Sequence, residues 1–152
     1  IEDAEFVFEG LKITLKKSKT DQFGEGFAKG IPHFENSIYC PVTSLKRWIN
    51  LSKIKKGPIF VRFTKGSKIT NTRLTDQSVA LIIKEYLLKA GIDNKNYSGH
   101  SLRSGFATSA AEAGAEERSI MAITGHKSTE MVRRYIKEAN LFKNNALNKI
   151  KF

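Results

Sequence analysis

Hydrophobic and polar positions alternate with the period of β-strands in the first part of the chain. Residues 6–15 carry apolar side chains at alternating positions and predict one strand, in which Gly10 marks a turn or bulge. The run over 27–31 predicts a returning strand, so the two runs are expected to form an antiparallel hairpin with lysines near its turn. A further short strand or buried extended piece is expected over 59–63.

Elsewhere the apolar positions follow the 3.6-residue period of amphipathic helices. One helix is predicted from Pro41 through Ile49. The strongest pattern covers 78–90, after a cap at Thr75 and before a stop at Gly91. The apolar stripe of this helix, which we expect to be buried, consists of Val79, Leu81, Ile82, Ile83, Tyr86, Leu87 and Leu88.

Further helices complete the predicted fold. They cover 102–113, 116–124 and 129–137, and a tail helix extends through Ile150. The sequence therefore predicts a mostly α protein with a small antiparallel β-hairpin or sheet, in the α+β class. With 152 residues, the chain is expected to form a single domain over 1–152.

Composition narrows the class of protein. Apolar residues make up 40% of the chain, which fits a globular protein and argues against disorder. Cys40 is the single cysteine, so we expect no disulfide framework and a reducing compartment. No apolar run approaches the roughly 20 residues of a membrane span, and no signal peptide is visible. Because the chain begins at Ile1 without an initiator methionine, we expect it to be a piece of something longer.

The charge of the chain is strongly positive. Lys and Arg number 26 against 15 Asp and Glu, which gives a net charge of +11 and a pI near 9.8. This balance favours a polyanionic partner, with nucleic acid first, although a generally basic solvated surface is the alternative. The sequence contains neither a P-loop nor a His-Glu-x-x-His motif, and it has no other nucleotide-binding signature.

Residues 98–135 gather side chains that could hold a phosphodiester and attack it. His100 and Arg103 are three positions apart and would share one face of a helix. The planar guanidinium of Arg103 fits two phosphoryl oxygens at once. An imidazole can donate a hydrogen bond or accept a proton near neutral pH, although His100 taken singly could equally be structural.

His126 and Tyr135 are nine positions apart and would lie on roughly opposite sides of one continuous helix. Gly125 predicts a helix stop and Ser128 a capped helix start, so a break is expected between the two side chains. Two helices meeting there could aim the imidazole and the phenol into one pocket. Tyr135 is then the candidate nucleophile, while the alternative is a core aromatic flanked by apolar residues.

A general acid must protonate the sugar hydroxyl that leaves a cut DNA strand. Lysine on a mobile hairpin suits this step, and Lys19 is the candidate. Lys16, Lys17 and Lys29 compete with it for the role.

These motifs, taken together, resemble the signature of the tyrosine recombinases, the phage integrase family. The signature consists of His100-x-x-Arg103, Gly125-His126 and Tyr135. Residues 18–22 and 40–42 are similar to integrases of mobile elements, and the resemblance covers nearly the whole chain.

The resemblance implies a DNA breaking and rejoining enzyme that acts in site-specific recombination or integration. Tyr135 would attack the scissile phosphate, form a 3′-phosphotyrosyl link and release a 5′-hydroxyl. Arg103 and His126 would stabilise the transition state, His100 would act as acid or base, and Lys19 would protonate the departing oxygen. The covalent link conserves the bond energy, so the resemblance implies no ATP, no metal and no other cofactor.

The resemblance also implies partners. Double-stranded DNA would be the substrate, and the full-length protein would act as a tetramer on paired sites, with residues 139–152 packing on a neighbouring protomer. The expected DNA contacts are Lys17, Lys127, Arg133 and Arg134. A bacterial or phage-encoded protein of the cytoplasm, associated with the nucleoid, is expected.

One departure from the family pattern stands out. The family has another catalytic arginine in a helix upstream of the hairpin, whereas no arginine precedes Arg47 here. The helical core-binding domain is missing as well, so we expect truncation and little or no cleavage by this fragment alone. Two alternatives stay open: a non-catalytic DNA-binding relative, and a relaxing enzyme like the type IB topoisomerases.

Overall fold

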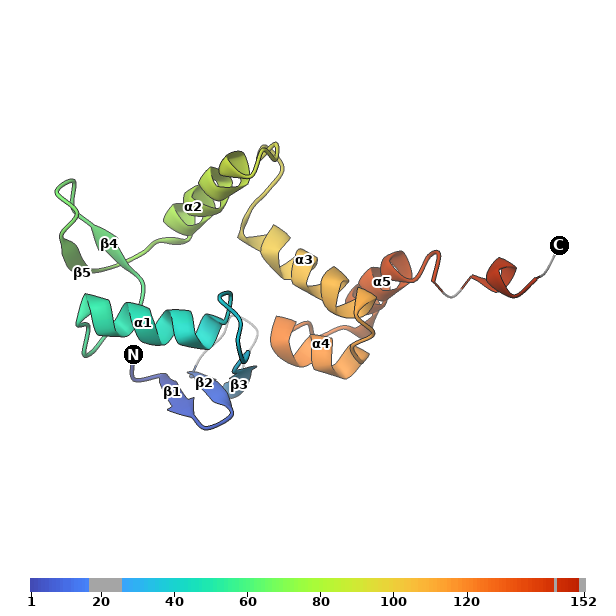
Figure 1. Cartoon of the computed structure of the whole chain (residues 1–152), viewed down its shortest axis with the longest axis horizontal. Helices are drawn as coiled ribbons and strands as arrows, with labels where there is room; N and C mark the ends of the chain where they lie inside the picture. The colour runs from blue at the N-terminus through green and yellow to red at the C-terminus, as the bar shows by residue number, and fades with distance from the viewer. Residues whose placement is uncertain (17–25, 144, 151–152) are drawn as a thin grey trace. The chain divides into compact units, whose positions relative to one another are not determined.

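The computed structural model describes residues 1–16, 26–143 and 145–150 (Figure 1). The strands are β1 (Ala4–Val7), β2 (Gly10–Leu15), β3 (Phe27–Pro32), β4 (Val61–Phe63) and β5 (Ile69–Arg73). The helices are α1 (Pro41–Ser52), α2 (Asp76–Lys89), α3 (Gly99–Glu112), α4 (Glu117–Thr124), α5 (Thr129–Ala139) and the short 3-10 helix η1 (Ala146–Lys149). The predicted α+β class, mostly helical with small antiparallel sheets, is confirmed.

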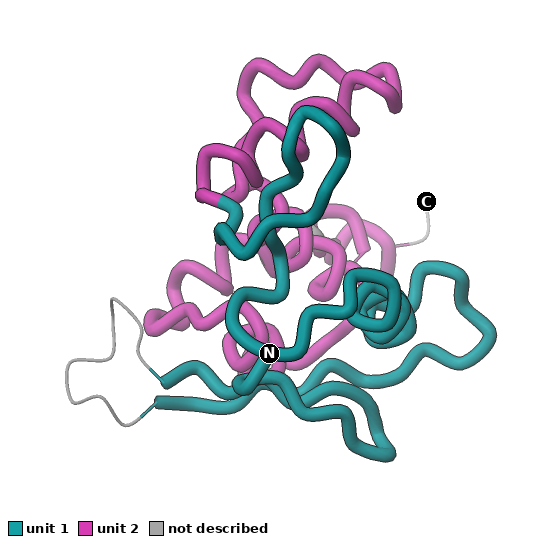
Figure 2. Tube along the Cα trace, turned by 90° about the vertical axis from the view of Figure 1, so that its left-hand side faces the viewer, with its two compact units in different colours: residues 1–74 teal, residues 75–152 magenta. Residues whose placement is uncertain are grey.

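The chain forms two compact units, Ile1–Leu74 and Thr75–Phe152, coloured teal and magenta in Figure 2. The first unit contains all the described strands and α1, and the second contains α2 to α5 and η1. The single catalytic domain over residues 1–152 stays a prediction. The motifs after Ser98 lie in the second unit, whereas Lys17 and Lys19 lie outside the described residues.

Unit 1 is built on a three-stranded antiparallel sheet in which β2 lies between β1 and β3. The strand predicted over 6–15 is divided in two, because Phe8 and Glu9 form a turn beside Gly10, where a turn or bulge was predicted, and this turn separates β1 from β2. Gly10 permits this turn, since its φ of +152° is a backbone conformation that other residues rarely adopt. The predicted pairing with the returning run is confirmed by the register of β2 on β3, and the tip of that hairpin lies outside the described residues.

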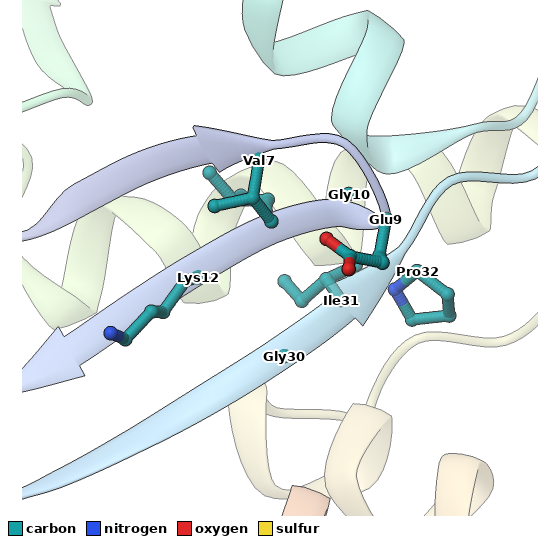
Figure 3. A pocket seen from close by; sticks show the side chains of 8 residues that line it. Val7, Glu9, Gly10, Lys12, Gly30, Ile31 and Pro32 are labelled. Carbon is teal, nitrogen blue, oxygen red and sulfur yellow. The ribbon is translucent and has the colours of Figure 1, made fainter.

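Gly10 and Gly30 lie near each other on β2 and β3, where they line a shallow hollow of about 270 Å³ (Figure 3). A Cβ at Gly10 would lie 2.1 Å from the carbonyl oxygen of Ile31, whereas a Cβ at Gly30 would meet no described atom within 4 Å. We therefore expect Gly10→Ala to destabilise unit 1 by about 3 kcal/mol. Denaturant unfolding measures the effect, with Gly30→Ala as the matched control. Equal unfolding midpoints for the two variants would contradict this account of the turn.

The helix α1 packs on the sheet through its first turn. Cys40, at the N-cap position, and Val42 are buried together with Leu11 of β2. Farther along, the indole Nε1 of Trp48 donates a hydrogen bond to the carbonyl oxygen of Ile59 at 2.8 Å. The predicted helix from Pro41 and the short strand near residue 61 are confirmed, whereas the sequence did not predict the pairing of β4 with β5.

Unit 2 begins with α2, whose ends match the sequence. The Thr75 hydroxyl accepts a hydrogen bond from the backbone N–H of Ser78, and Gly91 follows the helix with a φ of +73°. The predicted burial of the whole apolar stripe is wrong, because Leu81, Tyr86 and Leu88 are exposed. The stripe is wider than the contact that α2 makes with α3 in this unit.

The core of unit 2 lies between α3, α4 and α5. Its buried members are Ala107 and Ala111 of α3, Ile120 of α4 and Val132 of α5. Two alanines four positions apart form a shallow face on α3, and this lets α5 approach closely. Residues on that same face of α3 are therefore placed against α5.

The described part of the tail after α5 contains one short helical segment. The predicted tail helix is wrong, because the described residues form one 3-10 turn at η1 after a series of turns. The Asn145 side chain caps η1 by accepting from the N–H of Leu147, which favours a local turn over a longer helix. Lys143 donates to the carbonyl oxygen of Glu112 at the end of α3. None of the described helices is long and apolar enough to cross a membrane.

Candidate active site

The start of α3 positions the first pair of predicted site residues. Ser98 and Ser101 form a reciprocal capping box, in which the Ser98 hydroxyl accepts from the backbone and the Ser101 hydroxyl accepts from the N–H of Ser98 at 3.0 Å. This cap fixes the first turn, so His100 and Arg103 lie three positions apart on a regular helix, as predicted. His100 is exposed, whereas Arg103 is half-buried.

Arg103 has an unusual environment for a guanidinium. Its Nε atom is buried and has no hydrogen-bond partner among the residues that the structure describes. A buried N–H group without a partner is unfavourable, so such a donor is well suited to an anion that arrives from outside. Arginine presents two parallel N–H groups to an oxyanion, which makes a phosphate a fitting ligand for this side chain.

The break between α4 and α5 is the one that the sequence predicted. Gly125 ends α4 with a φ of +71°, and its N–H donates to the carbonyl oxygen of Met121 at 2.7 Å. His126 lies in the short link before α5 begins at Thr129. The prediction that Ser128 caps α5 with its hydroxyl is wrong, because Ser128 occupies the N-cap position without a side-chain capping bond.

His126 is buried between the helices, with only 7% of its surface exposed. Its Nδ1 atom lies 2.8 Å from Oγ1 of Thr124, the last residue of α4, which is also buried. Burial disfavours the imidazolium and lowers the pKa of His126, and the positive charges of Arg103 and His100 lower this pKa further. Arg103 and His100, in the first turns of α3, therefore lie near enough to the His126 imidazole for their charges to affect it.

Tyr135 completes this group from α5. Its ring centroid lies 6.0 Å from that of His126, with an angle of 38° between the ring planes. Its hydroxyl lies 3.1 Å from Oγ of Ser104, the residue that follows Arg103 on α3. The ring also packs on the core cluster of unit 2, so the core-aromatic alternative describes one side of Tyr135 while its hydroxyl has a polar environment.

Ser104 and Thr124 are site residues that the sequence analysis missed. A signal for Ser104 existed, because Ser104, Ala107 and Ala111 recur at helical spacing and define the face of α3 that meets α5. A signal for Thr124 was its position two residues before His126, within reach of a local side-chain hydrogen bond. The long-range contact between Ser104 and Tyr135 had no signal in the local sequence.

The predicted DNA-contact residues of unit 2 lie on its surface. Arg133 forms an ion pair with Glu117 of α4 at 3.1 Å, and Arg134 pairs with Glu138 one turn later at 3.3 Å. Lys127 is exposed in the link beside His126.

Lys17 and Lys19 lie outside the described residues. Within the ranges that the structure describes, no group of three or more His, Cys, Asp or Glu side chains is arranged to hold a metal ion.

Comparison with known proteins identifies the family to which the chain belongs. The model of the phage integrase family matches residues 39–141. The chain is 46% identical over 149 residues to the integrase/recombinase xerD homolog of Selenomonas ruminantium. This alignment covers 98% of this chain and 44% of that protein. It is 38% identical over 78 residues to tyrosine recombinase XerC of Syntrophus aciditrophicus strain SB, covering 51% of this chain and 23% of that protein.

A solved structure has the same fold. The crystal structure of XerA recombinase aligns with a TM-score of 0.66 at 22% sequence identity, covering 100% of this chain and 50% of that chain. The chain thus spans 44% of the first of the curated relatives and half of this structural relative. Family match, sequence identity and shared fold agree, and the chain belongs to the phage integrase family of tyrosine recombinases.

Proposed function

We propose that this chain is the catalytic part of a site-specific DNA recombinase. In this proposal it cuts and rejoins DNA through a 3′-phosphotyrosyl intermediate. The observation that carries the proposal is the arrangement in unit 2, where the Tyr135 hydroxyl is hydrogen-bonded to the residue next to Arg103 and the Tyr135 ring lies beside His126. A nucleophile, an anion-binding fork and a titratable imidazole are the parts that phosphoryl transfer through a covalent intermediate requires.

Arg103 is proposed to hold the scissile phosphate. Negative charge gathers on the non-bridging oxygens as a nucleophile approaches, and fixed donors aimed at these oxygens are the largest available source of catalysis. The unpartnered Nε atom of Arg103 supports this role, because binding an anion would satisfy it. His100, exposed on the first turn of the same helix, is proposed to assist as an acid or base.

Tyr135 is proposed to attack the phosphorus and to become linked to the 3′ phosphate of the cut strand. The bond to the 5′ oxygen then breaks, and a lysine ammonium, for which Lys19 is the candidate, protonates the leaving oxygen. Religation reverses these steps with the 5′ hydroxyl of another strand. Energy is retained in the phosphotyrosyl bond, so none of these steps requires nucleotide hydrolysis.

Double-stranded DNA is the proposed partner, and basic side chains are proposed to contact its phosphates. Lys17, Lys127, Arg133 and Arg134 are the proposed phosphate contacts, and a tetramer on paired sites is the proposed working assembly of the full-length protein. Arg133 would exchange its exposed ion pair with Glu117 for a phosphate, and this exchange costs little because surface ion pairs contribute about 0–1 kcal/mol.

DNA affinity should fall steeply with salt. The chain has a net charge of +11, and each neutralised phosphate contributes about 0.9 to the negative log–log slope of the binding constant against salt concentration. We expect Arg134→Gln to reduce this slope by about one unit, because one phosphate contact is lost. Fluorescence anisotropy over a salt series measures the slope. A flat profile would exclude this basic surface as the DNA-binding face.

Removing the Ser104 hydroxyl should slow strand cleavage without weakening DNA binding. Ser104→Ala removes the hydroxyl that is hydrogen-bonded to the proposed nucleophile, and one hydrogen bond corresponds to about a fivefold change in rate. Ser104→Thr retains the hydroxyl and should restore most of the rate. Single-turnover cleavage at saturating protein provides the measurement. Ser109→Ala, at an exposed position of the same helix, is the matched control.

Trapping on nicked DNA tests the proposed function. A nick beside the scissile phosphate lets the cut end diffuse away, so a covalent protein–DNA adduct should accumulate with the native full-length protein. Tight binding without adduct would favour a non-catalytic DNA-binding relative. Relaxation of supercoiled plasmids without site preference would favour an enzyme like the type IB topoisomerases.

A further inference from the structure

Two hydrogen bonds run in series from the backbone of α4 to the imidazole of His126. The Thr124 hydroxyl donates to the carbonyl oxygen of Ile120 at 2.7 Å, and the same Oγ1 atom lies 2.8 Å from Nδ1 of His126. A hydroxyl has one proton, which here is used on the carbonyl, so Oγ1 accepts from an N–H at Nδ1. A neutral imidazole has one ring proton, and therefore Nε2 of His126 has none.

Both side chains in this series of hydrogen bonds, those of Thr124 and His126, are buried. Thr124 is 8% exposed and His126 is 7% exposed, so water competes poorly for either hydrogen bond. The acceptor end is the carbonyl oxygen of Ile120 in the regular backbone of α4, and Gly125 turns the chain directly after Thr124 so that His126 faces back toward it. The tautomer is thus fixed by the fold of this segment, before any substrate is present.

We propose that Thr124 is a positioning residue that holds His126 as the Nδ1–H tautomer, so that Nε2 accepts the phenol proton when Tyr135 attacks DNA. This inference rests on the proposed function and adds the proton acceptor to it. The Tyr135 O–H bond breaks and an N–H bond forms at Nε2, while the phenol oxygen bonds to phosphorus. The bond from phosphorus to the 5′ oxygen breaks, and that oxygen takes its proton from a lysine ammonium.

The charges around His126 agree with this order of events. Arg103 and His100 of α3 face the imidazole, and with burial they lower the pKa of His126, which keeps it neutral and able to accept a proton. Tyr135 of α5 is the titratable group on the other side. A phosphate bound at Arg103 would offset the positive charge and make Nε2 more basic. After protonation, Nε2–H can donate to a phosphoryl oxygen. His126 would then first accept the phenol proton and afterwards stabilise the transition state.

Nitrogen NMR of histidine-labelled full-length protein tests the tautomer directly. At about pH 8, where a histidine of ordinary pKa is neutral, the two ring nitrogens of His126 should report a proton on Nδ1 and none on Nε2. Thr124→Ser keeps the hydroxyl and should give the same pattern. Thr124→Val, which has the same shape without the hydroxyl, should shift the population toward Nε2–H. A wild-type protein with Nε2–H, or an unchanged tautomer in Thr124→Val, would overturn the inference.

Cleavage kinetics test the consequence. Thr124→Val should lower the single-turnover rate of adduct formation on nicked DNA by about fivefold, with unchanged DNA affinity, and Thr124→Ser should recover the rate. Thr108→Val, at a half-buried position of α3 outside the hydrogen-bonded chain, is the matched control. A shifted tautomer with an unchanged cleavage rate would show that Nε2 is not the proton acceptor.

The two measurements separate this inference from the proposed function. If the wild-type protein forms no adduct, the proposed function and the proton transfer fail together, while the NMR result still decides whether Thr124 fixes the tautomer. If the wild-type protein forms adduct and the Thr124→Val variant matches it in tautomer and rate, only the inference about Thr124 fails.

Discussion

Replacing Tyr135 with phenylalanine should abolish the covalent adduct between the full-length protein and nicked DNA. The substitution removes one oxygen atom and keeps the ring that packs on the core of unit 2, so the fold should persist. Without the phenol oxygen no phosphotyrosyl bond can form, and we expect the cleavage rate to fall by about 10⁴-fold or more. Denaturing gel electrophoresis with end-labelled DNA measures the adduct.

Two controls make the Tyr135→Phe result specific. Tyr86→Phe removes the hydroxyl of an exposed tyrosine on α2 and should leave adduct formation unchanged. DNA binding by Tyr135→Phe should match the wild type, because the basic side chains proposed to hold the DNA phosphates are unchanged. Persistence of adduct in Tyr135→Phe would mean that another side chain is the nucleophile.

Arg103→Ala should produce the second largest loss, about 10³-fold in the cleavage rate. Removing one preorganised donor to a developing oxyanion typically costs 10²–10³-fold, and a guanidinium supplies a bidentate pair of donors. Arg103→Lys keeps the charge but loses the planar fork, so we expect it to recover about tenfold of the loss. Single-turnover cleavage at saturating protein separates this effect from weaker binding.

The environment of Arg103 provides an independent check on the same substitution. Its Nε atom is buried without a partner among the described residues, so Arg103→Met, which fills similar space without polar atoms, should preserve or raise the free energy of unfolding. A marked loss of stability in Arg103→Met would indicate a structural role for the guanidinium. Arg118→Ala, at an exposed position of α4, should leave cleavage unchanged.

The sequence predicted the helices of the site because local signals define them. The helix predicted over 102–113 begins three residues earlier, at Gly99, because Ser98 caps it, and the spacing of His100 and Arg103 places both on this helix. Gly125 adopts the left-handed conformation that ends α4, and this produced the predicted break before Tyr135. Each of these features depends on neighbours within a few residues, which is the range over which sequence patterns are most informative.

Features that depend on contacts between residues far apart in the sequence were harder to predict. The hydrogen bond between Ser104 and Tyr135 joins residues 31 positions apart and depends on how α3 and α5 pack through small side chains. The division of residues 6–15 into two strands depends on the positive φ of Gly10, which alternating hydrophobicity does not reveal. In the tail, the apolar positions suggested a helix, whereas the Asn145 side chain stabilises a short turn.

The most direct test of the central claim is the identity of the residue that becomes linked to DNA. The adduct formed by the full-length protein on nicked DNA can be digested with protease and nuclease, and the modified peptide sequenced by mass spectrometry. We predict a nucleotide attached through its 3′ phosphate to Tyr135. Attachment to any other side chain, or through a 5′ phosphate, would contradict the proposal that Tyr135, Arg103 and His126 form one phosphoryl-transfer site.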